Sequence, residues 1–281
     1  MISLRGLSKR YGGRTAVDDL SLDVKPGAVT GFLGSNGAGE STTMRMILGL
    51  DRPTAGTVFI GGVPYHEIRQ PLRTVGALLD ARGVPGAHLL ALARSNGIAR
   101  NRVEEVLETV GLADVAHRRA GALSPGMSQR LGIAGALLGD PEVKMFGEPV
   151  NGLDPDGVRW VRHLMRSLAD QGRTVFVSSH LMREMQLTAD HLVVSGRGRL
   201  IMDAPLAEVI ARSSLTAVVA GAGLRGADRG QHGVRRPEGG GTGWRSVNWA
   251  GRPAPSGRSC GRSARPGGAW RARSCSRCRA R

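Results

Sequence analysis

Cysteine is scarce in this 281-residue chain, and none occurs in its first 220 residues. The three cysteines, Cys260, Cys275 and Cys278, all lie close to the C-terminus. A chain that holds no disulfide over most of its length suits the reducing cytoplasm. Cys275 and Cys278 form a lone Cys-x-x-Cys pair without a second pair or a histidine partner, so we expect no zinc site.

Long apolar runs are also missing. No stretch approaches the about 18–20 consecutive apolar residues of a membrane-spanning helix, and the first residues do not form a signal-peptide pattern. We therefore expect that any role at a membrane comes through a partner protein.

Acidic residues nearly disappear toward the C-terminus. Residues 221–281 hold 14 arginines but only one aspartate and one glutamate, a net charge of +12. Residues 1–220 therefore carry only +4 of the total charge of +16. The strongly basic character belongs to the C-terminal segment, and we expect no nucleic-acid partner for the rest of the chain.

The same C-terminal segment lacks apolar periodicity, and its only large aliphatic residues are Leu224, Val234 and Val247. Such a segment cannot bury enough apolar surface to offset the entropy of ordering it, so we expect residues 216–281 to form a disordered Arg/Gly-rich tail. Three interpretations stay open. The tail is a binder of nucleic acid or anionic surfaces, a solvated appendage or, the interpretation that we favour, the product of a reading frame that shifted near residue 216.

Short apolar strands alternate with helical segments over residues 1–215, which we expect to form one domain. The pattern predicts strands within 1–24 and at 29–33, 57–60, 75–79, 143–146, 174–178 and 191–194, and helices at 44–50, 124–138, 181–189 and 206–212. Asp154 and Pro155 predict the start of another helix. This alternation implies an α/β fold with a mainly parallel sheet covered on both faces, into which a helical part is inserted at about 80–138.

A glycine-rich stretch follows the predicted strand 29–33 and reads Gly34-Ser35-Asn36-Gly37-Ala38-Gly39-Glu40-Ser41-Thr42. Strand, glycine-rich turn and helix form the context of a phosphate-binding loop, in which backbone N–H groups and a helix N-terminus face an anion. The hydroxyl of Ser41 is placed to ligate Mg²⁺. The pattern requires lysine after Gly39, whereas this chain has Glu40.

Four further motifs follow the loop. In chain order they are Leu123-Ser124-Pro125-Gly126-Met127-Ser128-Gln129-Arg130, Gly147-Glu148-Pro149, Asn151-Gly152-Leu153-Asp154 and Ser178-Ser179-His180. Each motif alone is weakly specific, but their order and spacing over residues 1–215 strongly resemble the nucleotide-binding subunit of ABC transporters. Among these the chain is most similar to the bacterial drug and antibiotic exporter type, such as the daunorubicin- and bacitracin-resistance ATPases.

The resemblance implies a P-loop NTPase (RecA-like) core with a small antiparallel β-subdomain and an inserted α-helical subdomain. It implies binding and hydrolysis of ATP with Mg²⁺, which drive export through a separate membrane permease. It also implies a homodimer that sits in the cytoplasm, peripheral on the inner face of the cell membrane.

Individual positions match family roles. Tyr11 matches the aromatic residue that stacks on adenine, and residues Gly34 to Thr42 match the Walker A loop. Ser124 and Gly126 match the signature motif, which closes over the ATP of the other subunit, and Asp154 matches the loop that couples the two sites. Glu148 matches the carboxylate that polarises the attacking water, and His180 matches the switch histidine near the γ-phosphate. The plainer alternatives are a packing tyrosine, a solvated carboxylate and a surface or core histidine.

Four positions depart from the family pattern. Glu40 replaces the Walker A lysine, and Gly147 replaces the Walker B aspartate that holds the water shell of Mg²⁺. Asp80 stands where most members have the glutamine that faces Mg²⁺ and the membrane partner. Lys144 puts a charge in a predicted buried strand, where it either reaches a sheet edge or destabilises the fold.

We expect the two charge changes to weaken ATP binding and to abolish hydrolysis. Two unit charges about 4 Å apart interact by roughly 4 kcal/mol at an effective dielectric of 20. About 1.4 kcal/mol is tenfold in affinity, so a heavily discounted loss still weakens binding by several tens-fold. The alternatives are a non-hydrolysing pseudo-ATPase subunit and a non-functional product of a decaying gene copy.

Overall fold

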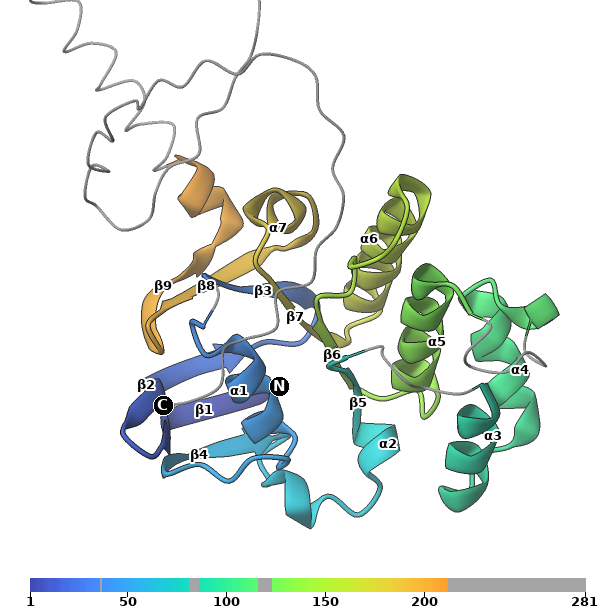
Figure 1. Ribbon diagram of the computed structural model, residues 1–281, viewed down its shortest axis with the longest axis horizontal. Helices are drawn as coiled ribbons and strands as arrows, with labels where there is room; N and C mark the ends of the chain where they lie inside the picture. Colours follow the sequence, from blue (N-terminus) through green and yellow to red (C-terminus); the bar gives the residue numbers. More distant parts are fainter. Residues whose placement is uncertain (36, 81–85, 116–122, 212–281) are drawn as a thin grey trace, which may run out of the picture. The chain divides into compact units, whose positions relative to one another are not determined.

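The computed structural model describes residues 1–35, 37–80, 86–115 and 123–211, all of which belong to one unit, Met1–Asp228 (Figure 1). The expected tail at 216–281, its cysteines and Asn36 lie outside the described residues. The domain limit between residues 215 and 216 therefore stays a prediction. Within the described ranges, every helix is too short or too polar to span a bilayer.

A six-stranded sheet forms the centre of the unit. The strand order is β5-β6-β7-β3-β8-β9. The first five strands pair in parallel, and β9 pairs antiparallel with β8. The strands are β3 (Ala28–Gly34), β5 (Val75–Leu78), β6 (Val143–Gly147), β7 (Thr174–Ser179), β8 (His191–Gly196) and β9 (Arg199–Pro205). The predicted parallel sheet is confirmed, whereas the edge strand β9 was not anticipated by the sequence pattern.

Both faces of this sheet are apolar because successive side chains along each strand point to opposite sides. In β7, Val175 and Val177 belong to one core cluster, while Phe176 between them belongs to the other. Phe176 stacks on Phe32 of β3 with ring centroids 5.5 Å apart. Strands that are buried on both faces appear in a sequence as short continuous apolar runs, and residues 174–178 form such a run.

Different layers cover the two faces (Figure 1). Helices α5 (Pro125–Leu137), α6 (Pro155–Asp170) and α7 (Met182–Thr188) pack into the first cluster. The second cluster lies between the large sheet, α1 (Glu40–Ile47) and an antiparallel sheet of order β2-β1-β4. The strands of that sheet are β1 (Ile2–Tyr11), β2 (Arg14–Val24) and β4 (Ala55–Ile60). This layer is the expected small β-subdomain.

The inserted helical part is also confirmed. Helices α3 (Gly86–Ser95), α4 (Arg100–Thr109) and α5 fall within residues 80–138, and Figure 1 shows α3 and α4 on the far side of α5 from the sheet. Short elements complete the fold: α2 (Pro71–Thr74), 3₁₀ turns at Tyr65–Glu67 and Ala113–Val115, and a helix at 206–211.

The limits of α1 differ from the prediction. The helix was expected at 44–50, where the apolar residues are concentrated, but it begins at Glu40 and ends at Ile47. Its N-cap is Gly39, with φ of 95° and no side-chain cap. The first turn of α1 faces a cavity rather than the core, and its residues are polar for that reason. Apolar periodicity in the sequence could therefore not reveal where the helix begins.

Lys144 does not reach a sheet edge, since β6 lies between β5 and β7. The residue is 1 % exposed, and its ammonium group donates a hydrogen bond to the carbonyl of Pro141. Burial and, to a smaller extent, the nearby guanidinium of Arg173 lower the pKa of Lys144 to about 8. The alternative of an edge position is therefore wrong. The buried, poorly solvated charge of Lys144 lowers the stability of the folded state.

We predict that Lys144→Met raises the free energy of unfolding at pH 7 by about 1–2 kcal/mol, because it removes a buried charge at similar volume. Urea denaturation measures this change. The unfolded lysine has a pKa of about 10.4, so between about pH 8 and pH 10 the unfolded chain binds more protons than the folded one. The unsubstituted protein therefore gains stability over this range, and the advantage of methionine shrinks.

The exposed Lys25 serves as the control, since Lys25→Met at the surface is expected to change stability by less than about 0.5 kcal/mol. A loss of stability in Lys144→Met, or a gain that is independent of pH, would contradict the proposed cost of this charge.

Candidate functional site

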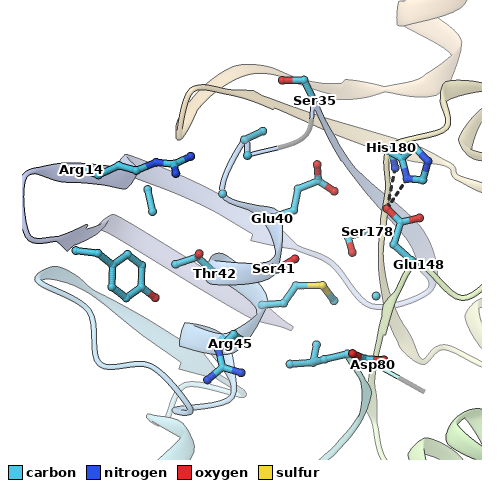
Figure 2. A pocket seen from close by; sticks show the side chains of 18 residues that line it. Arg14, Ser35, Glu40, Ser41, Thr42, Arg45, Asp80, Glu148, Ser178 and His180 are labelled. Atoms are coloured by element: carbon cyan, nitrogen blue, oxygen red, sulfur yellow. Dashed lines mark hydrogen bonds and ion pairs between the residues drawn. The ribbon is translucent and has the colours of Figure 1, made fainter. Parts of the chain in front are cut away.

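A cavity of about 640 Å³ opens at the carboxyl ends of β3, β6 and β7 (Figure 2). Ligands of open α/β sheets bind at this edge because the strand ends and the helix N-termini meet there. The lining comes from the β1–β2 hairpin, the loop into α1, and the strand ends: Tyr11, Arg14, Ala16, Ser35, Gly37, Ala38, Gly39, Glu40, Ser41, Thr42, Met44, Arg45, Leu79, Asp80, Gly147, Glu148, Ser178 and His180.

The glycine-rich loop passes close to its neighbours. Gly37 and Gly39 have φ of 84° and 95°, which favours glycine, and a Cβ at Gly39 would lie 2.5 Å from the carbonyl oxygen of Ala16. The N–H of Ala38 donates to the carbonyl of Ser35 at 2.8 Å, so the loop contains a tight turn. The first-turn amides of α1 have no intrahelical acceptor and lie at the cavity, as an anion site requires.

The carboxyl group of Glu40 lies against this loop. Its Oε1 is 2.7 Å from the position that a Cβ on Gly34 would take, and Figure 2 shows the side chain pointing from the start of α1 toward the loop. Burial raises the pKa of Glu40 to about 8, and the Glu148 carboxylate raises it in the same direction. At neutral pH the group is therefore largely protonated and neutral. Compared with a lysine at this position, it leaves the cavity without a positive charge but adds little negative charge.

Glu148 and His180 contact each other at the ends of β6 and β7. The Glu148 Oε1 accepts a hydrogen bond from the backbone N–H of His180 at 3.1 Å and lies 2.8 Å from His180 Nδ1 (Figure 2). The other carboxylate oxygen of Glu148 is buried and makes no hydrogen bond within the described residues. The two side chains therefore form a pair, in which the His180 side chain is 46% exposed and the Glu148 side chain 31%.

The backbone at Glu148 is held in an unusual conformation. Its φ is 48°, which side-chain-bearing residues rarely adopt and which costs about 1–3 kcal/mol. Its N–H donates to the carbonyl of Ser178 at 3.0 Å, and its carbonyl accepts from the Gln129 side chain at 3.0 Å. Two elements, β7 and α5, therefore fix the direction in which the carboxylate points.

The motifs at 123–130 and 151–154 lie elsewhere. Ser124 is the N-cap of α5 and accepts from the N–H of Met127 at 3.2 Å, and Asp154 caps α6 by accepting from Gly157 at 2.9 Å. Neither residue lines the cavity, and neither does Gly126. The cap predicted at Asp154 is confirmed.

Comparison with known proteins agrees with this geometry. Residues 17–151 match the ABC transporter family. The chain is 41% identical over 216 residues to the bacitracin transport ATP-binding protein BcrA of Bacillus licheniformis, a match that covers 73% of this chain and 70% of that protein. The chain belongs to the ABC transporter ATP-binding subunits.

Two further relatives of this ABC subunit are informative. It is 38% identical over 212 residues to the Nod factor export ATP-binding protein I of Burkholderia orbicola, covering 72% of this chain and 70% of that protein. A solved dimeric ATP-binding cassette, MJ0796, bound to ADP and Pi in a post-hydrolysis state, matches its fold with a TM-score of 0.66 at 23% identity. That match covers 73% of this chain and 99% of the solved one.

Most predicted site residues of the ABC subunit come together around the cavity. Tyr11, the loop residues 34–35 and 37–42, Asp80, Glu148 and His180 line it or adjoin it, and Asn36 lies outside the described residues. The Tyr11 ring is not core packing, because the residue is 48% exposed and its hydroxyl donates to Asp51 at 3.0 Å. Their roles in nucleotide binding stay predictions.

Gly147 lies at the cavity edge, where it offers no carboxylate. A Cβ there would lie 3.0 Å from the carbonyl oxygen of Leu79 on the neighbouring chain segment, which is a tight approach. Ser41 and Asp80 remain as the lining residues that could contact Mg²⁺ held with a nucleotide. The cavity thus lacks the carboxylate that the family places at position 147, while Ser41 and Asp80 still line it with a hydroxyl and a carboxyl group, oxygen ligands of the kind that Mg²⁺ takes.

Sequence reasoning missed three residues of this ABC subunit. Arg14 lines the cavity because the two-residue turn at Gly12 and Gly13 pairs it with Tyr11 across the β1–β2 hairpin. That signal was present in the sequence as Tyr11-Gly12-Gly13-Arg14. Gln129 and Ser178 brace Glu148 through the backbone, a role that no pattern in the sequence marks.

We predict that Gly34→Ala lowers the free energy of unfolding by about 1–3 kcal/mol, because overpacking strains closely packed groups. The added Cβ would lie 2.5 Å from the Ala38 Cβ, 2.7 Å from Glu40 Oε1 and 2.9 Å from the Ser195 hydroxyl. Gly13→Ala is the matched control, since no atom lies within 4 Å of its added Cβ. Equal denaturation midpoints for the two variants would contradict the described closeness of the loop.

Proposed function

We propose that this chain is the ATP-binding subunit of an exporter whose membrane-spanning part is a separate permease, and that this copy binds ATP weakly and does not hydrolyse it. The position of the Glu40 carboxyl group within the phosphate loop carries the proposal. The named relatives act in bacitracin transport and Nod factor export, which supports export of a compound by this subunit as well.

The loss of affinity follows from the charge in the loop. The Walker A lysine of the family would contribute an attraction of roughly 4 kcal/mol to a phosphate charge about 4 Å away at an effective dielectric of 20. A protonated Glu40 supplies none of this attraction, and an ionised one opposes it. Residues 39–42 still line the cavity, and the first amides of a helix have no intrahelical acceptor, so weak binding rather than none is expected.

The loss of hydrolysis follows from charge neutralisation rather than from the base. Glu148 is held by His180, Ser178 and Gln129 at the wall of the cavity, which supports a role for its carboxylate in orienting water. Phosphoryl transfer also requires that the negative charge of the phosphates be neutralised, and bound Mg²⁺ supplies part of this. With Gly147 in place of a carboxylate and Glu40 in place of a lysine, this chain lacks both the side chain that would hold Mg²⁺ and the side chain that would face the phosphates.

We predict that Glu40→Lys raises ATP affinity at least about tenfold, because it restores a charge-assisted contact to phosphate. Titration with a fluorescent ATP analogue, with and without Mg²⁺, measures the change. Hydrolysis is expected only when Gly147→Asp is added, since the single variant still lacks the Mg²⁺ carboxylate. The tight approach of Leu79 to Gly147 makes the second restoration less complete than the first.

The double variant with Glu148→Gln added is the control and should bind ATP without hydrolysing it. Turnover by the unsubstituted chain at the ordinary rate of about 1–100 per second would refute the proposed defect. A chain that purifies unfolded would instead support the alternative of a non-functional product.

A second copy of the chain would complete the site. Ser124 and Gly126 do not line the cavity of their own subunit, which supports a homodimer in which they face the ATP of the partner. The solved cassette of the same fold was observed as a dimer with ADP and Pi. In this arrangement the dimer would hold two ATP molecules, each between the loop of one subunit and the signature motif of the other.

We predict that ATP shifts the Glu40→Lys variant from monomer toward dimer in sedimentation velocity, and that adding Ser124→Asp prevents the shift. Aspartate caps a helix as well as serine does, so α5 keeps its N-cap hydrogen bond while a negative charge meets the phosphates. Ser124→Asn is the neutral control and should still dimerise. Dimerisation of the aspartate variant to the same extent would argue against this interface.

A further inference from the structure

We propose that Arg14 supplies the positive charge that faces the phosphates of a bound nucleotide in this subunit, in the absence of the Walker A lysine. The inference rests on the proposed function, because it concerns the same cavity, and it assigns a ligand contact to a residue outside the motifs.

Arg14 lies between the two places where a nucleotide would be held. It pairs across the β1–β2 hairpin with Tyr11, the predicted adenine contact. Its Nη2 atom lies 3.4 Å from the position that a Cβ on Gly37 would take, and Figure 2 shows the side chain extending from the hairpin toward the loop. The guanidinium is thus beside the turn of the phosphate loop, on the wall of the same cavity.

The Arg14 side chain is also uncommitted. Across residues 1–35, 37–80, 86–115 and 123–211 no hydrogen bond or ion pair engages its guanidinium, and the residue is exposed. Arg45, the other arginine of the lining, is held by Asp51, with Nε 2.8 Å from Oδ2 and Nη2 3.3 Å from Oδ1. Arg45 therefore already has its counter-charge, whereas Arg14 does not.

The charge balance of the cavity gives this difference its importance. The lining carries three carboxyl groups, those of Glu40, Asp80 and Glu148, which disfavour a polyanionic ligand. A guanidinium stays charged at every physiological pH and presents paired N–H donors that match phosphate oxygens. Arg14 at the loop would therefore replace part of the attraction for phosphate that is lost because Glu40 stands in place of a lysine.

The test is titration of the full-length chain with a fluorescent ATP analogue at low and high salt. Arg14→Ala is expected to weaken binding about tenfold at 50 mM salt and clearly less at 500 mM, because screening removes the contribution of an exposed charge. Arg14→Lys should retain most of the affinity. Arg10 is an exposed arginine of the same antiparallel sheet, and it does not line the cavity. Arg10→Ala should therefore leave binding and its salt dependence unchanged.

The outcomes separate this inference from the proposed function. If the unsubstituted chain binds the analogue and Arg14→Ala binds it equally well, the inference is overturned while the proposed function stands. If the unsubstituted chain does not bind, the proposed function fails. The inference, which rests on it, is then overturned as well.

Discussion

The close packing of the loop between β3 and α1 is the constraint on which the rest of the site depends. Gly34 has no room for a side chain against Ala38 and Ser195, and Gly39 passes directly beside the backbone of Ala16. Because the loop is pressed against β2 and β8 in this way, the side chain at position 40 has little choice of direction. A glutamate there lies against the loop itself, where burial favours its neutral form.

The proposed function separates two requirements of ATP hydrolysis that usually occur together. The carboxylate and histidine that would handle water are retained and braced, since Glu148 is held by β7, α5 and His180. In the proposed function, the positions that differ are Glu40, which brings no positive charge, and Gly147, which brings no carboxylate. The hydrogen bonds that hold Glu148 involve Ser178, Gln129 and His180 rather than positions 40 and 147, so its placement does not depend on a charge at either position.

The remaining positive charge near the loop comes from outside the motifs. Arg14 reaches the cavity from the hairpin that also presents Tyr11, so one short turn contributes to both ends of the proposed nucleotide position. Ser124 and Gly126 do not line this cavity. In the proposed homodimer they would face the cavity of the other copy.

Local patterns in the sequence were enough for the parallel sheet, the helical insertion, the cap at Asp154, and the family itself, because apolar periodicity and motif spacing are properties of adjacent residues. They failed where tertiary contacts decide. The start of α1 at Glu40, the edge strand β9, and the full burial of Lys144 each depend on what lies alongside in space. The same holds for the raised pKa of Glu40 and for the approach of Arg14 to Gly37, since burial and proximity to groups distant along the chain arise only when the sheet has assembled.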